Sequence, residues 1–147
     1  QCTCTPHQIL RYRSKLSGPL LDRIDIHIEV PALPFKDISD DRQREKSEAI
    51  RGRIGMARGI QIKRYDESGI YCNAQIKAKH LKKYCKINDA SHSLIETAVT
   101  KFGLSTRAYS RILRVSRTIA DLSNEENILP EHIAEAIQYR SLDRRIG

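Results

Sequence analysis

The sequence STRAYSRILRVSRTIADL at residues 105–122 has the clearest periodicity in the chain. At about 100° per residue, its arginines fall within roughly 120° of arc on one side of a helix, and its aliphatic residues lie on the opposite side. Ser105 or Thr106 is suited to open this helix, and Leu122 to end it. The pattern predicts the longest helix of the protein, with a polar face formed by Arg107, Arg111, Arg114 and Arg117.

The arginine face of this helix has two open interpretations. No acidic residue occurs between Glu96 and Asp121, so we expect these arginines to lack i,i+4 partners. The face is either an ordinary solvated surface or a phosphate-binding one, because guanidinium groups present paired donors to phosphate oxygens. Arg107 lies best for an anion at the helix N-terminus, where the helix dipole adds attraction. The pattern does not choose between a nucleotide and a nucleic acid.

Helical spacing extends over most of the remaining sequence. Thr5, Asn73 and Ser91 are suited to cap helices, Pro6 and Pro130 to begin them, and Gly103 to end one in the left-handed conformation. Residues 59–72 are predicted to form a loop. We expect helices at about residues 5–16, 44–58, 73–84, 91–101, 105–122 and 130–140.

One segment has the alternation of a half-buried strand. In residues 24–30 the apolar positions are Ile24, Ile26, Ile28 and Val30, with polar residues between them. A single strand cannot pair its own backbone groups, so we expect its sheet to precede residue 1. The chain also opens with Gln1 rather than Met, which favours a piece of a larger protein.

The composition is that of a globular domain with a basic surface. The 147 residues are 39% hydrophobic and 30% charged, which excludes a disordered chain. No uncharged apolar run approaches the roughly 20 residues of a membrane span. The net charge of +8 favours polyanionic partners. An acid-free run of lysines could contact such a partner or be a solvated face; it contains Lys77, Lys79, Lys82, Lys83 and Lys86.

The four cysteines form no recognisable disulfide framework, which favours free thiols in a reducing cytoplasm. Cys2 and Cys4 have the spacing of half a zinc site, or they are simply two solvated thiols. Cys72 and Cys85 are too far apart in sequence to supply the second short pair. No role is assigned to either of them.

A further candidate is Arg23, at the start of the expected strand. An arginine there could project into a neighbouring subunit as an arginine finger in phosphoryl transfer. It could equally form a surface ion pair with Asp22 or Asp25. The 147 residues contain no GxxxxGK[ST] phosphate loop and no credible nucleophilic triad, so we expect no catalysis by this chain alone.

Three segments share the pattern of one family: CTCTP at residues 2–6 with SGPLLDRID at 17–25, LSTRAYSRILRVSRTIADL at 104–122, and HIAEAIQYRSLDR at 132–144. Together they resemble magnesium-chelatase-like AAA+ ATPases of the ComM (YifB) type. The resemblance implies a mainly α fold, a C-terminal helical lid bundle plus one strand left over from the αβα ATPase core. Residues 1–31 would end the core, residues 32–43 would be a linker, and residues 44–147 would form the lid.

The resemblance also implies roles for individual residues. Arg23 matches the arginine finger that acts in trans on a neighbour's nucleotide, and Arg107 matches the sensor-2 arginine that contacts ATP within its own subunit. Arg111 and Arg114 are weaker candidates for nucleotide binding. Cys2 and Cys4 would be half of a zinc site whose other Cys-x-Cys lies upstream. The implied cofactors are ATP and Mg²⁺ in the larger protein, and Zn²⁺ at the cysteines, with none expected on the chain alone.

The implied activity belongs to a cytoplasmic, hexameric ATPase that remodels DNA, a branch-migration helicase linked to natural transformation. Its partners would be its own N-terminal AAA+ core, neighbouring subunits of a homohexamer, and DNA, with no membrane. Two alternatives remain open. One is a magnesium-chelatase subunit that drives metal insertion into a porphyrin, and the other is a non-catalytic basic module that binds nucleic acid directly.

Overall fold

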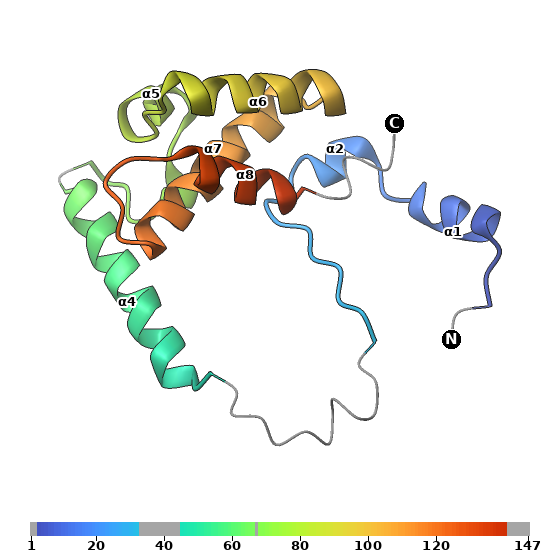
Figure 1. The fold of residues 1–147 in the computed structure, drawn as a ribbon, viewed down its shortest axis with the longest axis horizontal. Coiled ribbons are helices and arrows are strands. Elements are labelled where there is room, and N and C mark those ends of the chain that lie inside the picture. Colours follow the sequence, from blue (N-terminus) through green and yellow to red (C-terminus); the bar gives the residue numbers. More distant parts are fainter. Residues whose placement is uncertain (1–2, 33–44, 67, 141–147) are drawn as a thin grey trace.

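The computed structural model describes residues 3–32, 45–66 and 68–140, which are mainly helical (Figure 1). The predicted fold class is confirmed. β pairing within these ranges is limited to one parallel bridge between Ile87 and Ile128. No helix in them is both long and apolar enough to cross a membrane. The helices are α1 (Pro6–Arg13), α2 (Gly18–Leu21), α4 (Ser47–Arg64), the 3-10 turns η1 (Asn73–Gln75) and η2 (Ala78–His80), α5 (Leu81–Tyr84), α6 (Asp89–Phe102), α7 (Thr106–Leu122) and α8 (Pro130–Gln138).

Helix α7 lies at the centre of the bundle. In Figure 1 it lies among the other helices of the bundle, and it packs against α4, α5, α8 and η1. Ser105 is its N-cap, because the hydroxyl accepts a hydrogen bond from the amide of Ala108. The predicted apolar side is buried and includes Ala108, Ile112, Leu113, Ile119 and Ala120. The predicted start and periodicity are therefore confirmed, although α4, with 18 residues, is one residue longer than α7.

Helix α4 and the segment after it differ from the prediction. The helix continues to Arg64 instead of ending near residue 58. Ala57 and Gln61 are buried on one of its faces, so packing outweighs the weak helix propensity of Gly59. Residues 73–84 form two 3-10 turns and the short helix α5 rather than one continuous helix. Asn73 is not a cap, because its buried side chain bonds to other side chains within the bundle.

Several predicted helix ends are confirmed. Thr5 forms a capping box with Gln8, and Pro6 occupies the first position of α1. Gly103 ends α6 with φ 61° and ψ 35°, the left-handed conformation that glycine adopts at little cost. Pro130 begins α8. Figure 1 shows α1 standing away from the bundle, and residues 6–12 of this helix are exposed.

The strand expected over residues 24–30 is not formed. The segment has no β partner within the described residues, and an extended segment without a neighbouring strand cannot make a ladder. The amide of His27 instead donates to the carbonyl of Tyr139 at 2.7 Å. Ile28 and Val30 are 72% and 82% exposed, whereas His27, on the expected polar face, is buried. Most of the expected linker at residues 32–43 lies outside the described ranges.

Candidate phosphate-binding site

Four arginines from distant parts of the chain line one hollow of about 540 Å³. Arg107, Arg111 and Arg114 come from the first half of α7, and Arg23 comes from the turn that follows α2. Ala78 of η2 contributes to the same wall. The structure therefore brings together all four arginines that the sequence assigned to the finger and nucleotide-binding roles.

Two of these arginines have their guanidinium groups available. Arg107 is exposed and has no hydrogen bond or ion pair to any residue that the structure describes. Arg23 is also exposed, and its Nη1 donates one long hydrogen bond of 3.4 Å to the carbonyl oxygen of Pro19, which is weaker than one of ordinary length. Both side chains can therefore turn their donors toward a ligand in the hollow.

The other two arginines are held by the protein. Arg111 pairs with the carboxylate of Asp25, and Arg114 donates from Nε to the carbonyl oxygen of Ile76 at 2.9 Å. Asp25 offsets one of the four positive charges. The remaining three guanidiniums have no acidic partner within the described ranges, so the hollow carries a net positive charge.

The chemistry of the hollow suits phosphate. Guanidinium groups bind phosphate oxygens through charge-assisted hydrogen bonds. The N-terminus of α7, at Thr106 and Arg107, adds the positive end of a helix dipole. The lining contains no histidine, carboxylate or thiol. The arrangement can bind and stabilise negative charge, but it offers no group for proton transfer.

Arg117 does not belong to this hollow, although it shares the predicted arginine face. Its side chain is 3% exposed, and its Nε lies 3.1 Å from Oδ1 of Asp121. Its two terminal nitrogens donate to the backbone carbonyls of Glu125 and Glu126 at 2.7 and 2.8 Å. The expectation that no arginine has an i,i+4 partner is therefore wrong for Arg117. The signal was present in the sequence, because Asp121 lies four residues after it.

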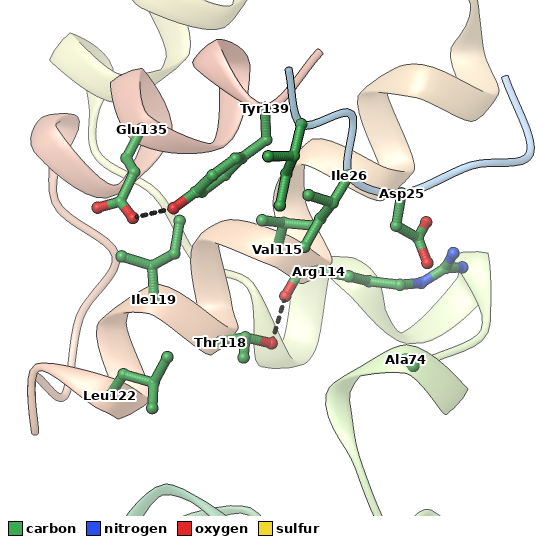
Figure 2. Close-up of a pocket in the computed structure, with 11 residues that line it drawn as sticks. Asp25, Ile26, Ala74, Arg114, Val115, Thr118, Ile119, Leu122, Glu135 and Tyr139 are labelled. Atoms are coloured by element: carbon green, nitrogen blue, oxygen red, sulfur yellow. Dashed lines mark hydrogen bonds between the residues drawn. The ribbon is translucent and has the colours of Figure 1, made fainter. Parts of the chain in front are cut away.

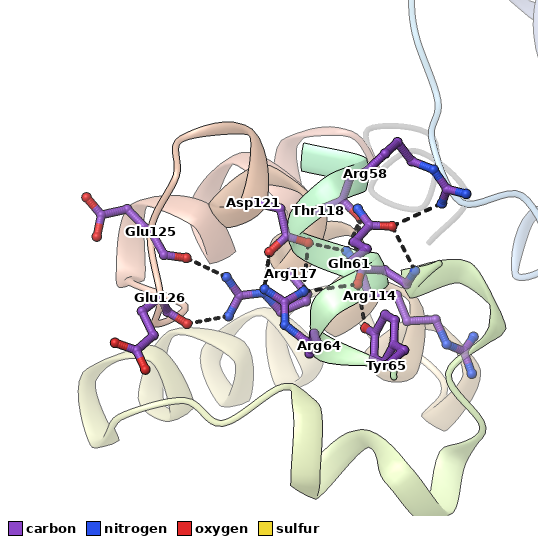
Figure 3. A network of polar contacts seen from close by, with 11 residues as sticks. Arg58, Gln61, Arg64, Tyr65, Arg114, Arg117, Thr118, Asp121, Glu125 and Glu126 are labelled. Carbon is purple, nitrogen blue, oxygen red and sulfur yellow. Dashed lines mark hydrogen bonds and ion pairs between the residues drawn. The ribbon is translucent and has the colours of Figure 1, made fainter. Parts of the chain in front are cut away.

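Asp121 is the centre of a buried polar network (Figure 3). Its side chain is fully buried. Its carboxylate accepts hydrogen bonds from Arg64 at 2.5 and 2.8 Å, and it also pairs with Arg117. Asn73 joins them by donating to Asp121 at 2.8 Å and to Thr118 at 2.9 Å. The network ties α4 and η1 to the C-terminal half of α7, and so fixes the helix that carries the hollow.

The two arginines of the network differ in their surroundings. Burial lowers the pKa of Arg117, and the nearby Asp121 offsets this only in part. Burial also opposes the charge of Arg64, but its hydrogen bonds to Asp121 raise the pKa of Arg64 above its ordinary value. Both guanidiniums remain charged at neutral pH, because the pKa of arginine is far above it. One buried cation, Arg117, and one half-buried cation, Arg64, therefore depend on the same carboxylate.

The family model described as the C-terminal part of magnesium chelatase subunit ChlI matches residues 44–140, and the model of magnesium chelatase subunit ChlI matches residues 1–38. The chain belongs to the magnesium chelatase ChlI family. It is 45% identical over 141 residues to the competence protein ComM of Haemophilus influenzae. The aligned residues cover 95% of this chain and 27% of ComM. It is 37% identical over 142 residues to YifB of Escherichia coli, covering 96% of this chain and 27% of YifB.

This ChlI-family chain is therefore ComM/YifB-like and a relative of AAA+-type ATPases, as its sequence resemblance predicted. A protein of Mycobacterium tuberculosis, Rv2897c, is 30% identical over 144 residues, covering 98% of this chain and 28% of that protein. The chain spans about a quarter of the length of these relatives.

A second hollow of the ChlI-family chain is apolar, with a volume of about 360 Å³ (Figure 2). Arg114 lines both this hollow and the arginine hollow, so the two adjoin. Tyr139 donates to Glu135 at 3.1 Å, which raises the pKa of Tyr139. The character of this hollow does not suit phosphate. Its apolar lining consists of Ile26, Ile28, Ala74, Val115, Ile119 and Leu122.

The cysteines of the ChlI-family chain do not assemble a metal site in the described ranges. Cys4 is free and exposed, and Cys2 lies outside those ranges. No group of three or more potential ligands there could hold a metal ion, so these residues do not by themselves fit zinc. Burial raises the pKa of Cys85 to about 11, which keeps it an inert thiol at neutral pH. Cys72 is half-buried and free.

Proposed function

We propose that this chain is the C-terminal lid and arginine-finger region of a longer, hexameric AAA+ ATPase (the parent protein) that remodels DNA. The observation that supports this most strongly is the shared hollow of Arg23, Arg107, Arg111 and Arg114. The similarity to ComM, which is named as a competence protein, supports a parent that acts on DNA during uptake or recombination, as a branch-migration helicase.

In this proposal, Arg107 and Arg23 bind the terminal phosphates of ATP and stabilise the charge that develops during hydrolysis. Arg114 lies beside them, held in place by the carbonyl of Ile76. Mg²⁺ bound with the nucleotide would neutralise further phosphate charge. The lining of the hollow contains no carboxylate that could coordinate it, so we assign its ligands to the parent's ATPase core.

The joint lining of the hollow bears on which subunit supplies each arginine. The sequence expectation assigns Arg107 to its own subunit's nucleotide and Arg23 to the neighbour's. Because both side chains line the same hollow, we propose instead that they serve one nucleotide, at the interface with the neighbouring subunit. The lid and the finger of one subunit would then complete the neighbour's site together.

Arg107→Ala in the parent protein is expected to weaken ATP binding or turnover about tenfold or more, because a charge-assisted hydrogen bond contributes roughly 1.5–3 kcal/mol. ATP affinity by titration and steady-state hydrolysis would measure it. Arg51→Ala is the matched control, since Arg51 is an exposed arginine of α4 that does not line the hollow. Unchanged ATP affinity and turnover in Arg107→Ala would contradict the proposed role.

Direct nucleic-acid binding is a second candidate function, and the lysine surface favours it. This surface consists of the exposed Lys77, Lys79, Lys82, Lys83 and Lys86. They supply five charges in a chain whose net charge is +8. Leu81 and Cys85 are buried on the inner side of the same segment, so the lysines face outward. No ion pair joins them to an acid within the described ranges.

The two candidates predict different behaviour of the 147-residue chain with duplex DNA. If the lysine surface binds phosphates directly, the logarithm of the affinity should fall with the logarithm of salt concentration with a slope of about −4 to −5. Changing Lys79, Lys82 and Lys83 to Gln should reduce that slope by about 2.7. If the chain acts only as a lid, we expect weak binding and no effect of these changes.

A magnesium-chelatase subunit is the remaining alternative, because both matching family models carry that description. Its ring would drive metal insertion into a porphyrin and would have no use for DNA. Stimulation of the parent's ATPase activity by branched DNA would support DNA remodelling. Stimulation by a chelatase partner and porphyrin, without any by DNA, would support the chelatase.

A further inference from the structure

The segment that carries Arg23 has no regular secondary structure after α2, yet it is attached to the bundle at several points. Leu21 before it is 2% exposed. After it, the carboxylate of Asp25 pairs with Arg111 of α7, and the amide of His27 donates to the carbonyl of Tyr139. Arg23 itself stays exposed. Its backbone is therefore fixed while its side chain is available.

Arg140 makes the central attachment. It directly follows the C-cap of α8, and its side chain is 2% exposed. Its Nη1 donates to the carbonyl oxygen of Ile24 at 2.9 Å, and its Nη2 lies 3.8 Å from the carboxylate of Asp22. The guanidinium therefore holds the residues on both sides of Arg23.

An arginine suits this position for a physical reason. A planar guanidinium presents several donors in a fixed arrangement, so it can reach a carbonyl and a carboxylate at once, whereas a lysine ammonium is a single point of charge. A segment outside helices and sheets has no ladder to order it, so each contact must offset the entropy of fixing the backbone. Burying a charged group is costly unless it is paired and hydrogen-bonded. The docked Arg23 segment supplies a hydrogen bond from Ile24 and an ion pair from Asp22 to this buried guanidinium.

We propose that Arg140 is a positioning residue, which fixes the Arg23 segment on the helical bundle so that Arg23 and Arg107 reach phosphate as one rigid unit. The inference rests on the proposed function, because it takes Arg23 to act on the nucleotide. It adds that Arg23, the proposed finger, moves together with the helical bundle that carries Arg107. A shift of the bundle then moves both arginines together.

The test compares Arg23→Ala, Arg140→Met and the double variant in the full-length parent protein. Arg140→Met is expected to lower kcat about ten- to a hundredfold, because the reacting geometry is lost, while the KM for ATP changes less than about twofold. The double variant should be no slower than Arg23→Ala alone, because Arg140 acts only through Arg23. A further loss in the double variant, or an unchanged kcat in Arg140→Met, would overturn the inference.

Two further measurements keep the test decisive if Arg140→Met folds poorly. Asp22→Ala removes the ion pair from the more exposed side, and it should lower kcat by a smaller factor and again add nothing to Arg23→Ala. Hydrogen exchange at the His27 amide should be faster in Arg140→Met than in the unchanged protein, and equal protection would also overturn the inference. If Arg23→Ala hydrolyses ATP normally, the proposed function fails, while the exchange measurement still decides whether Arg140 holds the segment.

Discussion

Arg23→Ala in the parent protein is expected to lower ATP turnover by about a thousandfold or more, the range found for arginine fingers in phosphoryl transfer. ATP binding and ring assembly should persist. The reason is the position of Arg23 in the structure. Its side chain is exposed, has no acidic partner in the described ranges, and lines a positively charged hollow together with Arg107. Its charge is available to the transition state rather than to the fold.

Single-turnover hydrolysis, nucleotide affinity and size-exclusion chromatography would separate these effects. Arg51→Ala again serves as the control, since it removes an equally exposed arginine outside the hollow. Arg23→Lys adds a sharper comparison, because it keeps the charge but loses the paired donors. Normal turnover in an assembled ring of Arg23→Ala subunits would show that Arg23 is not the finger.

Asp121→Asn is expected to lower the free energy of unfolding of the 147-residue chain by about 3 kcal/mol or more. The change keeps the shape of the side chain but removes the one carboxylate that pairs with Arg64 and Arg117. Arg117, which is 3% exposed, would remain as a buried charge without its partner, and such losses are strongly destabilising. Urea unfolding followed by circular dichroism would measure the change.

Glu125→Gln is the matched control for Asp121→Asn. Glu125 lies close by, but Arg117 bonds to its backbone carbonyl and not to its side chain. The free energy of unfolding of the Glu125→Gln chain should therefore change by less than about 0.5 kcal/mol. A loss of less than about 1 kcal/mol in Asp121→Asn would mean that the network does not hold α4, η1 and α7 together. The hollow would then need another explanation for its rigidity.

Local signals in the sequence predicted the framework of the fold well. The caps at Thr5 and Ser105 and the end of α6 at Gly103 each depend on a few adjacent residues, so their chemistry is readable without tertiary structure. The C-terminal end of α4 lies beyond the predicted one, because burial of Ala57 and Gln61 against the bundle extends the helix to Arg64. Burial is a property of the neighbours, not of the segment.

The candidate site was predicted residue by residue but not as an assembly. The arc of α7 placed Arg107, Arg111 and Arg114 together, yet nothing local shows that Arg23 joins them. The Asp25 pairing with Arg111 and the contact of Arg140 with Ile24 create that approach. Arg117 is the opposite case, because its partner Asp121 lies only four residues away in the sequence and the pairing is a local one.

The central claim is that Arg23 and Arg107 serve the same nucleotide, and mixed rings test it most directly. Subunits carrying Arg23→Ala, or separately Arg107→Ala, would be mixed with subunits defective in the phosphate loop, and ATP hydrolysis would be measured against each variant alone. We predict that both mixtures recover activity, because each arginine completes the site of the neighbouring subunit. Recovery with Arg23→Ala but none with Arg107→Ala would contradict the account, since the two arginines would then act on different nucleotides.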